Sequence, residues 1–119
     1  MTDVMEMREA GFPVEMTGGV PVVVAPEEID ITNAAELRSA LLHAAARGCP
    51  TIVLDMAQTT FCDSAGLHAL LGAHQRAQSE GAEVRFVVTG AAVRRILALT
   101  AMDRLLSVYT SLDDALTEP

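Results

Sequence analysis

The chain contains no lysine, and all eight of its basic residues are arginines. Walker A phosphate-binding loops, Schiff-base enzymes and Ser-x-x-Lys hydrolases each depend on a lysine side chain, so these three classes are excluded. The 16 acidic residues outnumber the basic ones and give a net charge of −8. Because nucleic acids and anionic membranes are bound by clustered positive charge, the scattered arginines argue against both as partners.

Aromatic residues, cysteines and long apolar runs are also scarce. Only 3% of the residues are aromatic and tryptophan is absent, so the core must consist mainly of aliphatic side chains. The two cysteines, Cys49 and Cys62, are too few for a disulfide framework, and no signal-peptide pattern opens the sequence. No apolar run approaches the roughly 20 residues of a membrane helix. These absences predict a reduced, cytoplasmic protein that does not enter the membrane.

The length and hydrophobic content predict a single folded domain. The chain has 119 residues, half of them hydrophobic, which is enough for one core and too little for two. Residues 1–10 mix methionine with charged residues without a clear period, so we expect a flexible tail there. The domain is accordingly expected to span residues 11–119.

The order of apolar runs and breakers predicts the element order β-β-α-β-α-β-α-β-α. A Gly18-Gly19 turn between two β-branched runs predicts an antiparallel hairpin. Asn33 and Glu36 have the spacing of a capping box at the start of the first helix, and Ser111 is expected to cap the last. Strands are predicted at residues 12–16, 20–25, 51–54, 84–88 and 108–109. The fold class is α/β, a mostly parallel mixed sheet of about five strands with an antiparallel opening hairpin and about four helices.

Polar residues that could carry chemistry gather after the strands, where sheets of this class place their functional loops. Asp30, Asp55 and Asp63 fall there, and Ser64 stands at the start of an apolar helix. In one interpretation, Asp63 or Ser64 simply caps that helix. In the other, Ser64 carries a phosphate, because a helix N-terminus offers free N–H donors and a favourable dipole to an anion.

Two enzymatic interpretations receive less support from the residues. A nucleophile elbow needs glycine two residues before the serine, where Cys62 stands, and the three histidines lie in predicted helices, with His74 on an apolar face. A magnesium site built from Asp30, Asp55 and Asp63 would mark a small enzyme, although a phosphoacceptor receiver would also need a lysine. Cys62 is expected to be a packing residue.

Two further surface features leave alternatives open. Small residues form one face of the second predicted helix, and this face either contacts a partner or packs against a neighbouring helix; its members are Ala65, Ala69, Gly72 and Ala73. The only basic doublet, Arg94-Arg95, either pairs with a partner or is merely solvated.

The loop around Ser64 resembles a known signature. Residues 61–67, Phe-Cys-Asp-Ser-Ala-Gly-Leu, resemble the F-x-D-S-x-G-L motif of STAS domains, in particular the stand-alone bacterial anti-sigma factor antagonists. Residues 28–31, 81–84 and 93–100 resemble further family segments, so the similarity covers roughly residues 11–117. Two positions depart from the family pattern: Glu27 stands where a glycine is frequent, and Ala65 replaces a second serine.

The resemblance implies a protein-binding switch without catalysis of its own and without cofactor or metal. An unphosphorylated antagonist binds an anti-sigma factor that is also a serine kinase of the histidine-kinase-like ATPase type, which frees a sigma factor. Phosphorylation of Ser64 would release the complex, and a PP2C-type phosphatase would reset it; Thr59 and Thr60 are alternative acceptors. The partner-binding residues it implies, together with the small-residue face, are Asp30, Asp63, Ser64, Ala65, Gly66 and Ala69.

A second function is compatible with the same resemblance. A STAS scaffold or accessory subunit, for instance of a stress-sensing assembly or a lipid-transport ATPase, would bind its partners without a phosphorylation cycle. The modification state of Ser64 in cells discriminates between the two functions.

Overall fold

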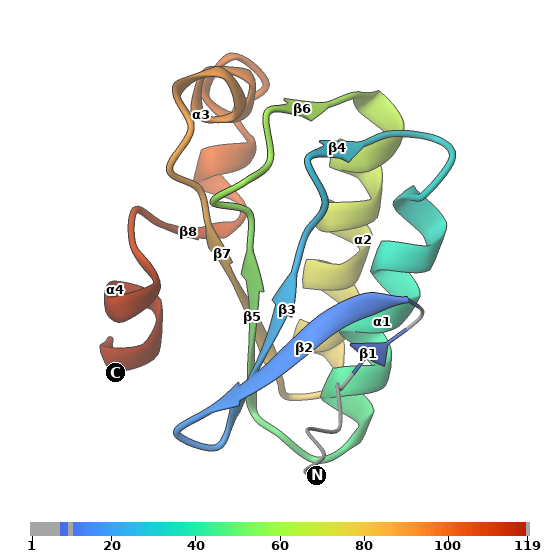
Figure 1. Cartoon of the computed structure of the whole chain (residues 1–119), viewed down its shortest axis with the longest axis vertical. Helices are drawn as coiled ribbons and strands as arrows, with labels where there is room; N and C mark the ends of the chain where they lie inside the picture. Colours follow the sequence, from blue (N-terminus) through green and yellow to red (C-terminus); the bar gives the residue numbers. More distant parts are fainter. Residues whose placement is uncertain (1–7, 10, 119) are drawn as a thin grey trace, which may run out of the picture.

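A mixed sheet of six strands forms the centre of the computed structural model, which describes residues 8–9 and 11–118 (Figure 1). Its strands, in spatial order, are β1 (Arg8–Glu9), β2 (Phe12–Thr17), β3 (Val20–Val24), β5 (Thr51–Asp55), β7 (Glu83–Val87) and β8 (Ser107–Tyr109). The pairs β1–β2 and β2–β3 are antiparallel, whereas β3, β5, β7 and β8 run parallel. The carboxyl ends of the parallel strands therefore meet at one end of the molecule.

Four α-helices and one 3₁₀ turn accompany the sheet in the described residues: α1 (Ala34–Ala46), α2 (Ser64–Ser79), α3 (Ala91–Leu99), η1 (Met102–Arg104) and α4 (Leu112–Thr117). Helices α1 and α2 pack side by side on one face of the sheet, and α4 lies on the other (Figure 1). Helix α3 lies at the end where the parallel strands terminate. This arrangement confirms the predicted α/β class, its antiparallel opening hairpin and its four helices.

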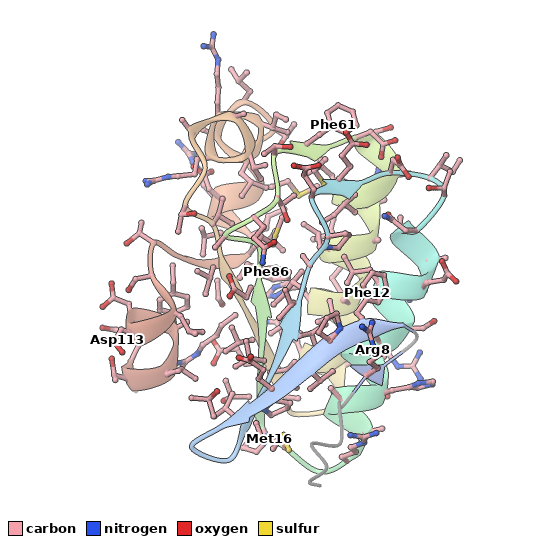
Figure 2. The ribbon with its side chains drawn as sticks, in the orientation of Figure 1. Arg8, Phe12, Met16, Phe61, Phe86 and Asp113 are labelled. Atoms are coloured by element: carbon pink, nitrogen blue, oxygen red, sulfur yellow. The ribbon has the colours of Figure 1, made fainter. Side chains whose placement is uncertain are left out.

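The strands have the continuous apolar character that two covered faces require. In β5, Ile52, Val53 and Leu54 are all fully buried. Ile52 and Leu54 belong to the main core beneath α1 and α2, which also holds Phe86 (Figure 2). Val53 faces the opposite way and packs in a small second core under α4.

A buried arginine attaches the C-terminal helix to the sheet. Nη1 of Arg85 on β7 donates to the carbonyl oxygens of Ala115 (2.9 Å) and Glu118 (2.7 Å) at the end of α4. Its Nε donates to the carboxylate of Glu83 at 3.1 Å, and its guanidinium lies 5.4 Å from the ring centroid of Tyr109. Because a buried guanidinium must be paired, this cluster fixes where α4 ends.

Three features differ from the prediction. Arg8 and Glu9, expected in the flexible tail, pair with Pro13 and Phe12 as strand β1, while residues 1–7 and 10 of that tail lie outside the described residues. Two short strands, β4 (Glu28–Ile29) and β6 (Phe61–Cys62), form a separate parallel pair that the sequence pattern did not indicate. The 3₁₀ turn η1 was not predicted either.

The predicted capping box at the start of α1 is wrong. Asn33 occupies the N-cap position, but its side chain makes no bond to the helix. Its Oδ1 instead accepts from the Asp30 backbone N–H at 3.0 Å, and its Nδ2 donates to the Glu28 carbonyl at 2.8 Å. Asn33 therefore holds the preceding loop in place. The Ser111 cap of α4 is confirmed, since Ser111 Oγ accepts from the Asp114 N–H.

Candidate functional site

Two loops meet at the carboxyl end of the parallel strands. The loop after β3 contributes β4 and the loop after β5 contributes β6, and the two pair in parallel through Glu28–Phe61 and Ile29–Cys62 (Figure 1). Two more backbone bonds extend this pairing, from Thr60 N to Glu27 O at 2.8 Å and from Asp63 N to Ile29 O at 3.1 Å. The loops that carry Asp30 and Ser64 are thereby joined into one unit.

Helix α2 begins with a side-chain cap that the serine does not supply. Oδ1 of Asp63 accepts from the backbone N–H of Gly66 at 2.9 Å, and the Asp63 carbonyl accepts from Leu67 N. Asp63 is therefore the N-cap, and Ser64 is the first helical residue. The Ser64 side chain is exposed, and its hydroxyl makes no hydrogen bond with any residue that the structure describes. The hydroxyl is thus open to solvent.

Gly66 allows the start of α2 to approach both loops closely. A Cβ atom at this position would lie 2.7 Å from Cys62 Sγ, 2.9 Å from Ile29 Cγ2 and 3.0 Å from the Ile29 carbonyl oxygen. Real Cβ atoms essentially never come within 3.0 Å of such neighbours. The glycine of the Asp-Ser-Ala-Gly segment is consequently a packing requirement that sets where Ser64 sits relative to Asp30.

Asp30 is held by the turn that follows it. Its Oδ1 accepts hydrogen bonds from the Thr32 hydroxyl and from the Thr32 backbone N–H. Both bonds favour the charged carboxylate, the hydroxyl bond more strongly, and they lower the pKa of Asp30 below its usual value. Asp30 therefore contributes a fixed negative charge to the surface beside Ser64.

Cys62 lies beneath this surface. Its side chain is buried in the main core, as the packing interpretation predicted. Burial, with a smaller contribution from the negative charge of Asp63, raises the pKa of the Cys62 thiol to about 11. The thiol stays protonated at physiological pH, which removes the nucleophilic form that redox chemistry requires.

The acidic residues proposed for a magnesium site have separate roles. Asp30 bonds to Thr32, Asp63 caps α2, and Asp55 Oδ1 accepts from the Ala57 N–H at 3.0 Å. Within residues 8–9 and 11–118, no group of three histidine, cysteine or carboxylate side chains could hold a metal ion. The magnesium hypothesis is left without a ligand set.

The small-residue face of α2 is divided between packing and surface. Ala73 belongs to the main core, and Ala69 is buried, with an exposed fraction of 8%, on the helix that packs against α1. Ala65 and Gly72 remain partly open and line, with Ala69, a groove of about 440 Å³ between α1 and α2. The face therefore serves mainly to bring the two helices together, and the groove that remains begins next to Ser64.

His74, on the same helix, is buried as its apolar position predicts. Its Nδ1, however, has no hydrogen-bond partner in the described part of the chain.

Two large apolar side chains at this end were not predicted. Ile31, between Asp30 and α1, is 79% exposed, and Phe61 on β6 is 45% exposed (Figure 2). Phe61 could have been noticed as one of only three phenylalanines, placed directly after the polar run Gln58-Thr59-Thr60 and two residues before Asp63.

Comparison with known proteins identifies the class to which this fold and loop belong. Residues 12–115 match the model of the STAS domain, and the chain belongs to that family. In the described residues, no helix combines the length and the apolar character needed to span a bilayer.

The relatives place the chain among the anti-sigma factor antagonists within this family. It is 32% identical over 101 residues to the anti-sigma-F factor antagonist RsfB of Mycobacterium tuberculosis, covering 83% of this chain and 80% of RsfB. An anti-sigma factor antagonist of Mycobacterium paratuberculosis has a crystal structure with a TM-score of 0.78 and 36% identity, over 87% of this chain and 88% of that one. The phosphorylated form of SpoIIAA from Bacillus shares the fold at a TM-score of 0.64 and 19% identity, over 88% and 96% of the two chains.

Proposed function

We propose that this anti-sigma factor antagonist is a phosphorylation-controlled binding switch. Unphosphorylated, it binds an anti-sigma factor through the surface around Ser64 and so frees a sigma factor; phosphorylation of Ser64 ends the binding. The observation that carries the proposal is the exposed Ser64 hydroxyl, without a hydrogen-bond partner in the described residues, at the first position of α2. The relatives named as anti-sigma factor antagonists support the identity of the partner.

The docking surface in this proposal combines charged residues, exposed residues and buried small residues. Asp30 and Asp63 supply negative charge, and Ser64 and Ala65 are open to a partner. Gly66 and Ala69 are buried, so they do not contact the partner themselves. Their small size lets α2 pack closely and so determines where the exposed residues lie. A partner can approach α2 closely because no long side chain stands between residues 63 and 66 of the chain.

Phosphorylation changes this surface in two ways. A phosphate adds a charge of about −1.5 to −2 next to the carboxylates of Asp30 and Asp63. The N–H groups in the first turn of α2 that Asp63 does not cap, together with the helix dipole, stabilise the anion on the unbound protein. In a complex, the same group must be desolvated against a partner already fitted to a small hydroxyl, so binding becomes unfavourable.

The anti-sigma factor would itself be the serine kinase, and a PP2C-type phosphatase would restore the hydroxyl, all in the cytoplasm. The antagonist supplies the acceptor oxygen and no catalysis of its own. The existence of a phosphorylated form of SpoIIAA, which shares the fold, supports this cycle.

The alternative acceptors differ from Ser64 in their accessibility. Thr59 is buried, with an exposed fraction of 1%, and its hydroxyl donates to the Pro26 carbonyl at 2.8 Å. Thr60 is exposed, with its hydroxyl 3.4 Å from the Glu27 carbonyl. The structure therefore favours Ser64 first, Thr60 second and Thr59 not at all.

Two measurements test the function. Phosphopeptide mass spectrometry of protein recovered from its native cells, across growth and stress conditions, should find condition-dependent phosphate on Ser64. Purified protein should bind an anti-sigma factor of the same organism, and Ser64→Asp should abolish the complex while Ser64→Ala retains it. A Ser64 that is unmodified in every condition, together with a complex that tolerates Ser64→Asp, would refute the switch and favour the scaffold function.

A further inference from the structure

Helix α3 forms a second half of the surface on which Ser64 lies. The Thr89 hydroxyl, just before α3, donates to the Ala57 carbonyl at 3.3 Å in the loop that leads to Ser64. A Cβ at Gly90, the N-cap of α3, would lie 3.4 Å from the Thr59 carbonyl oxygen. Figure 1 shows α3, β6 and β4 side by side at the same end of the molecule. A partner centred on Ser64 therefore meets α3 at its edge.

The two halves of this end carry opposite charge. The loops around Ser64 hold Asp30 and Asp63, preceded by Glu27 and Glu28. Helix α3 has no acidic residue and carries the doublet Arg94-Arg95, both exposed. The chain as a whole has a net charge of −8, so an arginine doublet without acidic residues on its helix is a local exception.

The doublet is also without partners inside the described chain. Arg76 on α2 pairs with Glu80 at 2.7 Å, and the buried Arg85 pairs with Glu83. Arg94 and Arg95 make no ion pair or hydrogen bond through their side chains with residues 8–9 or 11–118. The N-terminus of α3 likewise lacks a side-chain cap.

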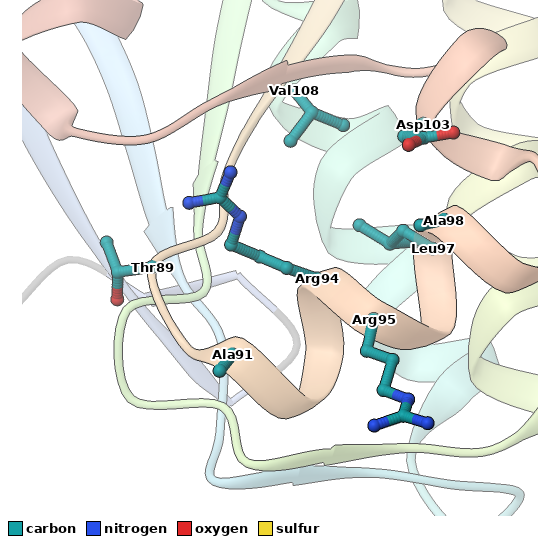
Figure 3. A pocket seen from close by; sticks show the side chains of 8 residues that line it. All are labelled: Thr89, Ala91, Arg94, Arg95, Leu97, Ala98, Asp103 and Val108. Carbon is teal, nitrogen blue, oxygen red and sulfur yellow. The ribbon is translucent and has the colours of Figure 1, made fainter.

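Arg94 stands over a cavity that could receive a side chain. The cavity, of about 470 Å³, lies between α3 and the segment from η1 to β8, with apolar walls that include Leu97, Ala98 and Val108. Figure 3 shows the guanidinium of Arg94 extending across this space towards Val108 and Thr89, whereas the side chain of Arg95, also in the lining, extends in the opposite direction. Asp103, also in the lining, forms no ion pair with Arg94.

We propose that an acidic segment of the anti-sigma factor docks on α3, with one carboxylate paired to Arg94 over the cavity and an apolar side chain inserted into it. This inference rests on the proposed function and adds a requirement on the partner. A surface that is acidic around Ser64 and basic on α3 is matched only by a partner with the reverse arrangement. Such complementarity fixes the orientation of the complex and accelerates association.

Charge reversal tests the inference against a matched control. Arg94→Glu places a like charge opposite the acidic segment, and we expect it to raise the Kd for the anti-sigma factor about tenfold or more. Arg95→Glu, at a position that the proposal does not pair with the carboxylate, should raise the Kd less. Arg76→Glu makes the same charge change on the far end of α2 and should alter the Kd less than about twofold. Circular dichroism establishes that all three variants fold.

The absence of lysine allows a direct test of the contact. Arg94→Lys introduces the only side-chain amine in the protein. Carbodiimide treatment of the complex should then form an amide bond between position 94 and an aspartate or glutamate of the anti-sigma factor, identified by mass spectrometry. Arg76→Lys should give no such cross-link.

The outcomes separate the inference from the function on which it rests. A wild-type protein that binds its anti-sigma factor while Arg94→Glu matches the Arg76→Glu control, with no cross-link at position 94, overturns the inference alone. A wild-type protein that binds no anti-sigma factor overturns the function and the inference with it. A cross-link from position 94 to a second copy of this chain would assign α3 to self-association and overturn the inference.

Discussion

Two glycines on helix α2 are expected to respond to the same substitution with opposite sign. At Gly66, an added Cβ would lie within 3.0 Å of Cys62 and of both side-chain and backbone atoms of Ile29. At Gly72, it would meet only Arg38, with Nε at 2.9 Å, and Arg38 is an exposed, flexible side chain. An alanine side chain therefore clashes at position 66, whereas at position 72 the Arg38 side chain can move aside.

The expected magnitudes follow from two terms. Replacing glycine by alanine inside a helix stabilises it by about 1 kcal/mol at either position. At Gly66, overpacking costs about 1–3 kcal/mol. The upper part of that range applies because the Ile29 carbonyl belongs to β4 and cannot turn away. We expect Gly66→Ala to lower the free energy of unfolding by about 1–2 kcal/mol, and Gly72→Ala to raise it by about 0.5–1 kcal/mol.

Urea unfolding followed by circular dichroism measures both effects. The midpoint should fall for Gly66→Ala and rise for Gly72→Ala with an unchanged m-value, which shows that stability alone has changed. For a domain of this size, the corresponding shifts in Tm are about 3–5 °C per kcal/mol. The reasoning is refuted if Gly66→Ala proves as stable as Gly72→Ala, because the close approach of α2 to β4 and β6 would then be unimportant.

Three further predictions concern the same end of the molecule. Ala101, after α3, has a left-handed backbone with φ of 60°, so Ala101→Gly should raise the unfolding free energy by about 1 kcal/mol, measurable in urea. Asp63→Ala removes the cap of α2 and should cost about 1 kcal/mol, whereas Ser64→Ala should stay within about 0.5 kcal/mol of wild type. Because the pKa of Cys62 is raised to about 11, iodoacetamide at pH 8 should label Cys49 first; faster labelling of Cys62 would contradict its burial.

The sequence pattern predicted the sheet and the helices because each of them buries a continuous or periodic apolar face. The run Ile52-Val53-Leu54 needs cover on both sides, and it has a core on each. The position of Ser64 at the start of an apolar helix could likewise be predicted, since helix starts are marked by capping residues. Which of Asp63 and Ser64 is the cap could not be predicted, because both residue types perform that role equally well.

Features that depend on distant segments could not be predicted from local patterns. Strands β4 and β6 have two residues each, too few for any period, and they exist only because the loops after β3 and β5 are brought together. Asn33 has the composition of a cap, yet the neighbouring loop takes up both its donor and its acceptor. The closeness of α3 to the Ser64 loop arises in the same way, from the order of strands in the sheet.

The pairing of β4 with β6 has a consequence for the free energy of binding a partner. Two separate loops would each have to be ordered on binding, and each immobilised segment would subtract from the affinity. Here the backbone bonds from Thr60 to Glu27 and from Asp63 to Ile29 have already ordered them in the free protein. A preorganised epitope loses little entropy on association, so a modest contact area suffices for binding. In the proposed switch, a single phosphate would then be enough to shift the equilibrium towards release.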